Sequence, residues 1–226
     1  MKKKDSKRQL VIKTLTAITL IIFFVVIFFL LPPIVTTLLL LALLAELFFV
    51  EWPRLFNKNK LTGLLLFPIY PTIPIVLAIA LNHNPPYRML LFYLAVLVAL
   101  FDIGSYFFGS AFGKNKIAPT ISPRKSWEGA IGGFLVTTTV LSLILWLKGS
   151  SFTLLTTPLI LGLIICTLAL SGDLFESWLK RKAGVKDSAD FLPGHGGVLD
   201  RFDGMLFVLP FFYLFKDFLS YLFGLV

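Results

Sequence analysis

Residues 89–108 read MLLFYLAVLVALFDIGSYFF, a run of 20 residues in which Asp102 is the only charged side chain. A helix of about 20 apolar residues is long enough to cross the hydrocarbon core of a bilayer. Six further runs of 17 to 22 residues have the same character: Leu10–Leu31, Ile34–Val50, Leu61–Leu81, Ala130–Leu147, Leu154–Leu170 and Met205–Val226. The sequence therefore predicts an all-α, multi-pass transmembrane helix bundle with about seven spans.

The composition of the whole chain agrees with this prediction. Of its 226 residues, 57% are hydrophobic and 15% are charged, and the mean hydropathy is +0.88. Soluble domains carry about 25% charged residues, so the composition excludes a soluble enzyme and a disordered chain. It also excludes a nucleic-acid-binding module, despite a net charge of +9. Cys166 is the single cysteine, so no disulfide or cysteine-based zinc site can form within one chain.

The distribution of basic residues predicts the orientation of the chain. If the N-terminus is cytoplasmic, 18 of the 21 lysines and arginines fall on the cytoplasmic side, as the positive-inside rule requires. The first apolar run is longer than the core of a signal peptide and Pro32-Pro33 follows it, so we expect an uncleaved first span. We expect a protein of the cell (inner or plasma) membrane, with its N-terminus and the two loops at 102–129 and 171–204 in the cytoplasm.

The first of these loops carries charged groups next to glycines. Asp102, Tyr106, Gly109 and Gly113 follow spacings of four, three and four, which place them on one helix face. An acid inside a span is costly and indicates function. The alternative for Asp102 is a position at the level of the lipid headgroups, paired with a lysine. The alternative for the glycines is that they only permit close packing of helices. Ser122-Pro123 is typical of the start of a helix. The first turn of that helix would contain Arg124 and Lys125 and would suit a phosphate. The alternative is an ordinary helix cap in a basic loop.

The second loop is richer in acids and bases. Asp173, Glu176, Ser177 and Lys180 are spaced i, i+3, i+4 and i+7, so they share a face of a helix that continues from the sixth span. Asp200 and Asp203 lie one turn apart at the start of the last span, and carboxylates of this kind suit Mg²⁺. Residues 193–197, PGHGG, predict a tight loop that lets the backbone approach a ligand. A solvated loop without a ligand is the alternative.

The pattern of these residues resembles the signature of the phosphatidate cytidylyltransferase (CDP-diacylglycerol synthase) family. It comprises Ser177, Lys180-Arg181, Lys186-Asp187, residues 193–197 and Asp200-Arg201-Phe202-Asp203, all at the family's spacing. Gly172-Asp173 and residues 112–129 also resemble family segments. The resemblance divides the chain into N-terminal spans at 1–101, expected to provide a scaffold and lipid access, and a catalytic transmembrane region at 102–226 with the signature at 177–203.

The resemblance implies an enzyme that transfers CMP from CTP to phosphatidic acid, releasing pyrophosphate and giving CDP-diacylglycerol. It also implies Mg²⁺ or another divalent cation, membrane lipids as surroundings, and a homodimer. Asp173 and Asp200 would bind the metal. The catalytic residues implied are Asp173, Lys186, Asp187, Asp200, Arg201 and Asp203; the substrate-binding residues implied are Lys114, Ser122, Lys125, Ser126, Glu128, Ser177, Lys180, Arg181, His195, Gly196 and Gly197.

Other functions stay open at this stage. A CTP-dependent lipid kinase would use similar substrates but would move the γ-phosphate, and an ether-lipid phosphate could replace phosphatidic acid as the acceptor. A transporter would place charged residues near the middle of spans, where only Lys216 and Asp217 fit, since Glu46 lies closer to the end of a span.

Overall fold

The structure is a computed structural model that describes residues 25–57, 59–149, 156–189 and 197–226. Five helical stretches are long and apolar enough to cross a membrane: Pro33–Leu55, Lys60–Asn82, Pro85–Phe112, Trp127–Leu147 and Thr156–Ala183. A sixth consists of two helices bent by 88° at Phe215. The predicted multi-pass helical bundle is therefore confirmed. The first predicted run, Leu10–Leu31, lies largely outside the described residues, so the number of seven spans stays a prediction.

The N-terminal half contains three apolar segments with breaks at prolines. The first is α2 (Pro33–Glu46), a π-helical turn η1 (Leu47–Glu51) and α3 (Trp52–Leu55); the second is α4 (Lys60–Leu66), the π-helical turn η2 (Pro68–Thr72) and α5 (Ile73–Asn82). The third, α6 (Pro85–Phe112), starts with prolines, whose missing N–H groups cost nothing in a first helical turn.

The C-terminal half consists of α7 (Trp127–Leu147), α8 (Thr156–Ala183), α9 (Leu199–Leu214) and α10 (Lys216–Leu222). Both α6 and α8 have 28 residues and extend beyond the apolar runs from which they were predicted. Their additional turns carry Asp173 and Lys180 on α8, as the i, i+3, i+4, i+7 spacing predicted. The start of α9 likewise carries Asp200 and Asp203 one turn apart, as predicted.

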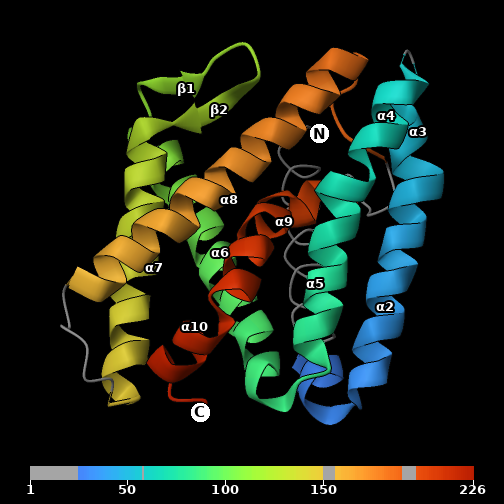
Figure 1. Ribbon diagram of the computed structural model, residues 1–226. Helices are drawn as coiled ribbons and strands as arrows, with labels where there is room; N and C mark the ends of the chain where they lie inside the picture. Colours follow the sequence, from blue (N-terminus) through green and yellow to red (C-terminus); the bar gives the residue numbers. More distant parts are fainter. Residues whose placement is uncertain (1–24, 58, 150–155, 190–196) are drawn as a thin grey trace, which may run out of the picture.

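The predicted helix start at Ser122-Pro123 is wrong. Residues Ser122–Ser126 form strand β2, which pairs antiparallel with β1 (Lys116–Ala118), and α7 begins only at Trp127. Ser126 is the N-cap, and its Oγ accepts a hydrogen bond from the Gly129 N–H at 3.2 Å. Serine can cap a helix at either position, and the pairing of β2 with β1 favours the later one. In Figure 1 the hairpin lies at one end of the bundle and the C-terminus at the other.

Two hydrophobic clusters hold the bundle together. One joins α6, α7, α8, α9 and α10 around Phe101, Ile165 and Phe212. The other joins the N-terminal segments to α8 and α9 through Leu47, Trp52, Leu179 and Leu199, among others. Glycines bring α6 and α7 close together: a Cβ on Gly133 would lie 2.6 Å from the Phe101 carbonyl oxygen and closer still to Ser105 Oγ. Small residues therefore set the distance between these two helices, as in many membrane bundles.

Candidate active site

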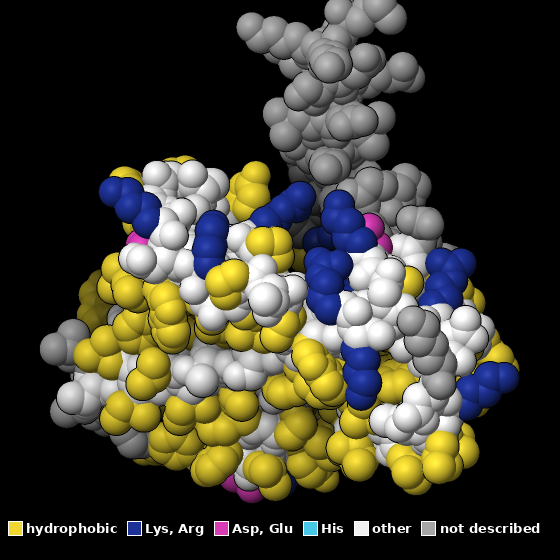
Figure 2. Space-filling view, turned by 90° about the horizontal axis from the view of Figure 1, so that it is seen from above, with side chains coloured by type: hydrophobic (Ala, Val, Ile, Leu, Met, Phe, Trp, Pro, Cys, Tyr) yellow, Lys and Arg dark blue, Asp and Glu magenta, His cyan; other side chains and the backbone are white. Residues whose placement is uncertain are grey.

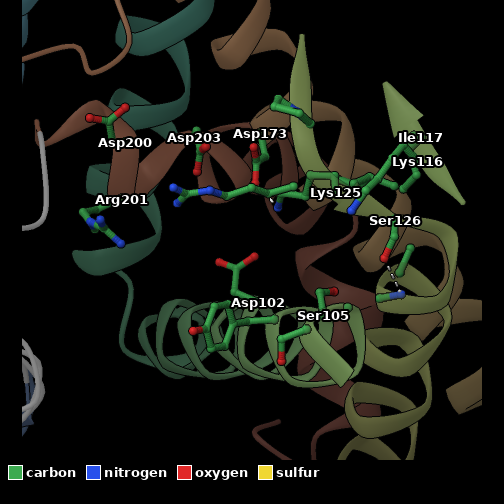
Figure 3. Close-up of a pocket in the computed structure, with 18 residues that line it drawn as sticks. Asp102, Ser105, Lys116, Ile117, Lys125, Ser126, Asp173, Asp200, Arg201 and Asp203 are labelled. Carbon is green, nitrogen blue, oxygen red and sulfur yellow. Dashed lines mark hydrogen bonds and ion pairs between the residues drawn. The ribbon is translucent and has the colours of Figure 1, made fainter. Parts of the chain in front are cut away.

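A cavity of about 490 Å³ lies between the hairpin and the ends of the long helices. Its walls come from α6, the two strands, α7, α8 and α9 (Figure 3). The polar side chains that line it are Asp102, Ser105, Tyr106, Ser110, Lys116, Arg124, Lys125, Ser126, Asp173, Asp200, Arg201 and Asp203. Figure 2 shows lysine and arginine side chains gathered at this end of the molecule, next to broad hydrophobic surfaces. The cavity is thus a charged site at the end of an apolar bundle.

An ion pair between the hairpin and α8 lies at the centre of the cavity. The Lys125 ammonium contacts the Asp173 carboxylate, and the side chains remain about one-quarter exposed. Ser177 Oγ donates a hydrogen bond to Asp173 Oδ1 at 3.4 Å from the next turn of α8. Asp102 from α6 and Asp203 from α9 face the same ion pair (Figure 3), close enough to interact with it electrostatically. Three helices and the hairpin therefore bring three carboxylates around one lysine.

The surroundings of Lys125 determine its charge. Burial alone would lower the pKa of the ammonium group, but the carboxylate of Asp173, followed by those of Asp102 and Asp203, outweighs burial and raises the pKa above its ordinary value. Lys125 is therefore a stable cation. The cavity lining as a whole holds four acids, Asp102, Asp173, Asp200 and Asp203, and four bases, Lys116, Arg124, Lys125 and Arg201.

Asp200 lies at another wall of the cavity and is fixed by four contacts. Its Oδ1 is 2.5 Å from the Lys180 ammonium, and its Oδ2 accepts hydrogen bonds from the Gly197 N–H at 2.8 Å and from Ser188 Oγ at 3.1 Å and the Ser188 N–H at 3.3 Å. Lys180 also forms an ion pair with Glu176, whose side chain is fully buried. Lys180 and the Ser188 and Gly197 backbone thus hold Asp200 in one orientation.

The structure brings only part of the predicted set to the cavity. Among the predicted residues, six line it: Lys125, Ser126, Asp173, Asp200, Arg201 and Asp203. Nine described residues do not: Lys114, Ser122, Glu128, Ser177, Lys180, Arg181, Lys186, Asp187 and Gly197. His195 and Gly196 lie outside the described residues. The substrate contacts of these residues stay predictions.

Several of the residues outside the cavity lining stabilise the hairpin and its contact with the end of α8. Glu128 accepts hydrogen bonds from the backbone N–H groups of Lys114 and Asn115 at 3.2 and 3.1 Å. Arg181 donates to the carbonyl oxygens of Ile121 at 3.1 Å and Val185 at 3.2 Å, which ties the end of α8 to the hairpin turn. Lys186 and Asp187 are exposed in the turn after α8.

Sequence reasoning assigned no site role to Ser105 and Lys116, which line the cavity, and named Arg124 only as part of a phosphate-binding helix start. Lys116 and Arg124 are on adjacent strands of a hairpin that was not predicted. Glu51 was missed because it directly follows the predicted end of a span, although it belongs to the helical segment Pro33–Leu55. The rule that an acid within a span indicates function would have singled it out.

The donor set fits a divalent cation held by few protein ligands. Within the described ranges, no three His, Cys, Asp or Glu side chains form a cluster that could hold a metal ion by themselves. However, Asp173 and Asp200 are each paired with a lysine ammonium, so a positive charge lies where a cation would bind. Mg²⁺ commonly takes one or two carboxylates and completes its shell with water and substrate phosphates.

The fold and the cavity define an integral membrane protein whose charged groups gather in one cavity at the end of an apolar helix bundle. The sequence profile described as the cytidylyltransferase family matches residues 59–219. The chain belongs to this family.

Relatives with a known name agree with the family. The chain is 45% identical over 188 residues to a phosphatidate cytidylyltransferase of Haemophilus influenzae, and the aligned region covers 78% of this chain and 65% of that protein. It is 40% identical over 134 residues to one of Pseudomonas aeruginosa, covering 59% and 49%, and 45% identical over 126 residues to one of Bacillus subtilis, covering 54% and 45%. The matched region thus spans about two thirds or less of these relatives.

Proposed function

We propose that this protein transfers CMP from CTP to phosphatidic acid and forms CDP-diacylglycerol and pyrophosphate. The observation that carries the proposal is the cavity in which Asp173 and Asp203 face Lys125 and Arg201, in a chain of the cytidylyltransferase family. The names of its relatives specify phosphatidate as the acceptor. An acceptor that resides in the bilayer also fits a cavity at the end of transmembrane helices.

In the proposed reaction, an oxygen of the phosphatidate phosphate attacks the α-phosphorus of CTP. A new P–O bond forms, the bond between the α-phosphorus and the bridging oxygen to the β-phosphate breaks, and pyrophosphate leaves with that electron pair. The attacking phosphate is already ionised, so the protein needs to provide position and charge neutralisation more than a strong base. Lys116, Arg124 and Arg201 line the cavity as cations and would hold phosphate oxygens.

Asp173 and Asp200 would hold a divalent cation, with Asp203 and Asp187 in support. When bound, the cation would neutralise phosphate charge on CTP and on the departing pyrophosphate. Lys125 and Lys180 already neutralise the two ligand carboxylates; they would have to yield to the metal or share these groups with it. Arginine suits forked contacts to phosphate oxygens, whereas lysine supplies a point charge, so Arg124 and Arg201 are the better candidates for orienting a phosphate.

The same proposal includes topology and assembly. With the N-terminus in the cytoplasm, the hairpin, the end of α8 and the start of α9 would face CTP in the cytoplasm. Phosphatidic acid would present its phosphate at the same depth of the membrane. The excess of lysine and arginine at this end supports that orientation (Figure 2). The family resemblance supports a homodimer in the cell membrane.

Labelled CTP tests the reaction. Purified protein in detergent–phosphatidate micelles with Mg²⁺ is given CTP labelled at the α- or at the γ-phosphate. We expect only the α label to enter lipid, and Asp200→Asn to abolish that transfer while the protein still inserts normally. Entry of the γ label would identify a lipid kinase instead. Repeating the assay with an ether-lipid phosphate distinguishes the two acceptor classes.

A further inference from the structure

Glu51 is a fully buried carboxylate in the N-terminal part of the chain, outside the cavity and outside the region that matches the family profile. Its Oε1 accepts a hydrogen bond from the Val198 N–H at 2.5 Å, and its Oε2 accepts one from the Leu199 N–H at 3.0 Å. These two N–H groups belong to the start of α9, almost 150 residues further along the chain. A side chain of the apolar segment Pro33–Leu55 thus caps the helix that carries Asp200 and Asp203.

The N-cap residue of α9 does not cap its own helix. The N-cap position is Val198, whose side chain has no oxygen and makes no cap hydrogen bond. The free N–H groups of a helix start need acceptors and favour a negative charge. Leu47, Trp52 and Leu199 pack together in this region, so an uncapped N–H group would be left in apolar surroundings. Glu51 supplies two acceptors that the Val198 side chain cannot provide.

The turn before Glu51 is widened. Leu47–Glu51 form a π-helical turn, in which the Trp52 N–H bonds to the Leu47 carbonyl oxygen. Pro53 follows, and its ring crowds the carbonyl of Phe49 and offers that carbonyl no N–H group. A single π-helical turn changes the direction of the side chains after it relative to a regular α-helix, and such turns are frequent at functional sites. Here the widened turn ends at the residue that reaches α9.

Asp200 and Glu51 hold adjacent backbone groups. The Gly197 N–H donates to Asp200, while the next two N–H groups donate to Glu51. A Cβ on Gly197 would lie 2.6 Å from Glu51 Oε1 and closer still to Ser188 Oγ, so the backbone at Gly197 fits tightly between these two side chains. Without Glu51, the freed N–H groups of Val198 and Leu199 would lie next to Asp200 and could compete for its carboxylate.

We propose that Glu51 is a positioning residue for CMP transfer, which fixes the start of α9 and thereby the direction of the Asp200 carboxylate. This role rests on the proposed function. Glu51 touches neither the cavity nor a substrate, so its loss should reduce the rate of transfer more than the affinity for CTP. A misplacement of a reacting group by about 1 Å can cost about 100-fold in rate.

The test compares Glu51→Gln with Asn82→Ala in the full-length protein. The Glu51→Gln change keeps the size of the side chain but removes the charge and one acceptor oxygen. Asn82 is the matched control, because it is also buried and its Nδ2 donates to Pro33 O at 2.7 Å and Thr37 Oγ1 at 3.1 Å, tying another pair of helices. Transfer of α label from CTP gives kcat and KM, and thermal unfolding in detergent gives the stability of each variant.

We expect kcat of Glu51→Gln to fall at least about tenfold with KM for CTP within about threefold of wild type. Asn82→Ala should lose stability but keep kcat per folded molecule. A second variant adds Val198→Ser to Glu51→Gln, which gives α9 a local N-cap and covers the case in which Glu51→Gln alone does not fold. We expect this double variant to fold and to remain slow, since the Val198 and Leu199 N–H groups still lack Glu51.

Three results would overturn the proposal. If Glu51→Gln retains wild-type kcat, Glu51 does not position Asp200. If the local cap restores kcat, Glu51 only stabilises the helix. If wild-type protein transfers no α label, the proposed function fails, and the role of Glu51 fails with it; an active wild type with unaffected variants counts against Glu51 alone.

Discussion

The Nζ atom of Lys180 lies 2.5 Å from Oδ1 of Asp200, and this contact joins the end of α8 to the first turn of α9. Lys180 also pairs with Glu176 on its own helix, and the side chains of all three residues are about nine-tenths buried or more. The ammonium group therefore contacts two acidic side chains from inside the protein. Sequence reasoning assigned Lys180 to substrate phosphates, and in the structure its ammonium group contacts Asp200, a predicted metal ligand.

Lys180→Met should destabilise the protein as well as inactivate it. Methionine fills a similar volume but leaves the buried Asp200 and Glu176 side chains without the ammonium group that contacts both, and removing one partner of a buried ion pair costs about 3–5 kcal/mol. Thermal unfolding in detergent measures the change. Lys182→Met is the control, because Lys182 is exposed on the same helix over the Trp178 ring. Equal stability of the two variants would show that the buried pair is dispensable.

Asp173→Asn should reduce CMP transfer by about 100-fold or more, because it removes a charge from the centre of the cavity and leaves Lys125 without its partner. The α-label assay measures the rate. Asp217→Asn makes the same chemical change outside the cavity lining, where Asp217 accepts a hydrogen bond from Tyr87, and should keep near wild-type activity. Similar losses in both variants would argue against a special role for Asp173.

Removal of divalent cations should stop the reaction. Asp173 and Asp200 provide too few ligands to hold a metal ion without substrate phosphates, so we expect weak binding and easy extraction. Dialysis against EDTA followed by the α-label assay should give no transfer, and added Mg²⁺ should restore it. Undiminished transfer in the presence of EDTA would exclude a dissociable metal from the reaction.

Gly133→Ala should destabilise the bundle by forcing α6 and α7 apart. The added methyl group would lie 2.6 Å from a backbone carbonyl oxygen of α6 and closer still to Ser105 Oγ, so the two helices would have to move apart. Overpacking of this kind costs about 1–3 kcal/mol. Leu143→Ala is the control on the exposed face of α7, and thermal unfolding should separate the two. An unchanged unfolding temperature for Gly133→Ala would mean that the helix crossing is loosely packed.

Local patterns in the sequence correctly predicted much of the site. The spacing of Asp173 and Lys180 placed them on one helix face, and the spacing of Asp200 and Asp203 placed them one turn apart. The two helices pack closely at Gly109, because a Cβ on Gly129 of α7 would lie 3.1 Å from the Gly109 Cα atom. The start of α7 was misplaced because Ser122 and Ser126 are both suitable caps, and only pairing with β1 distinguishes them.

The sequence by itself determined the membrane bundle, because the hydrocarbon core requires long apolar helices whatever their neighbours are. It also determined which residues share a helix face, because the helical period is local. Only the tertiary structure decided which charges meet. Lys125 contacts Asp173, Lys180 contacts Asp200, and Glu51 reaches the start of α9 across almost 150 residues. Contacts of this kind depend on how helices and hairpin pack, and no local spacing encodes them.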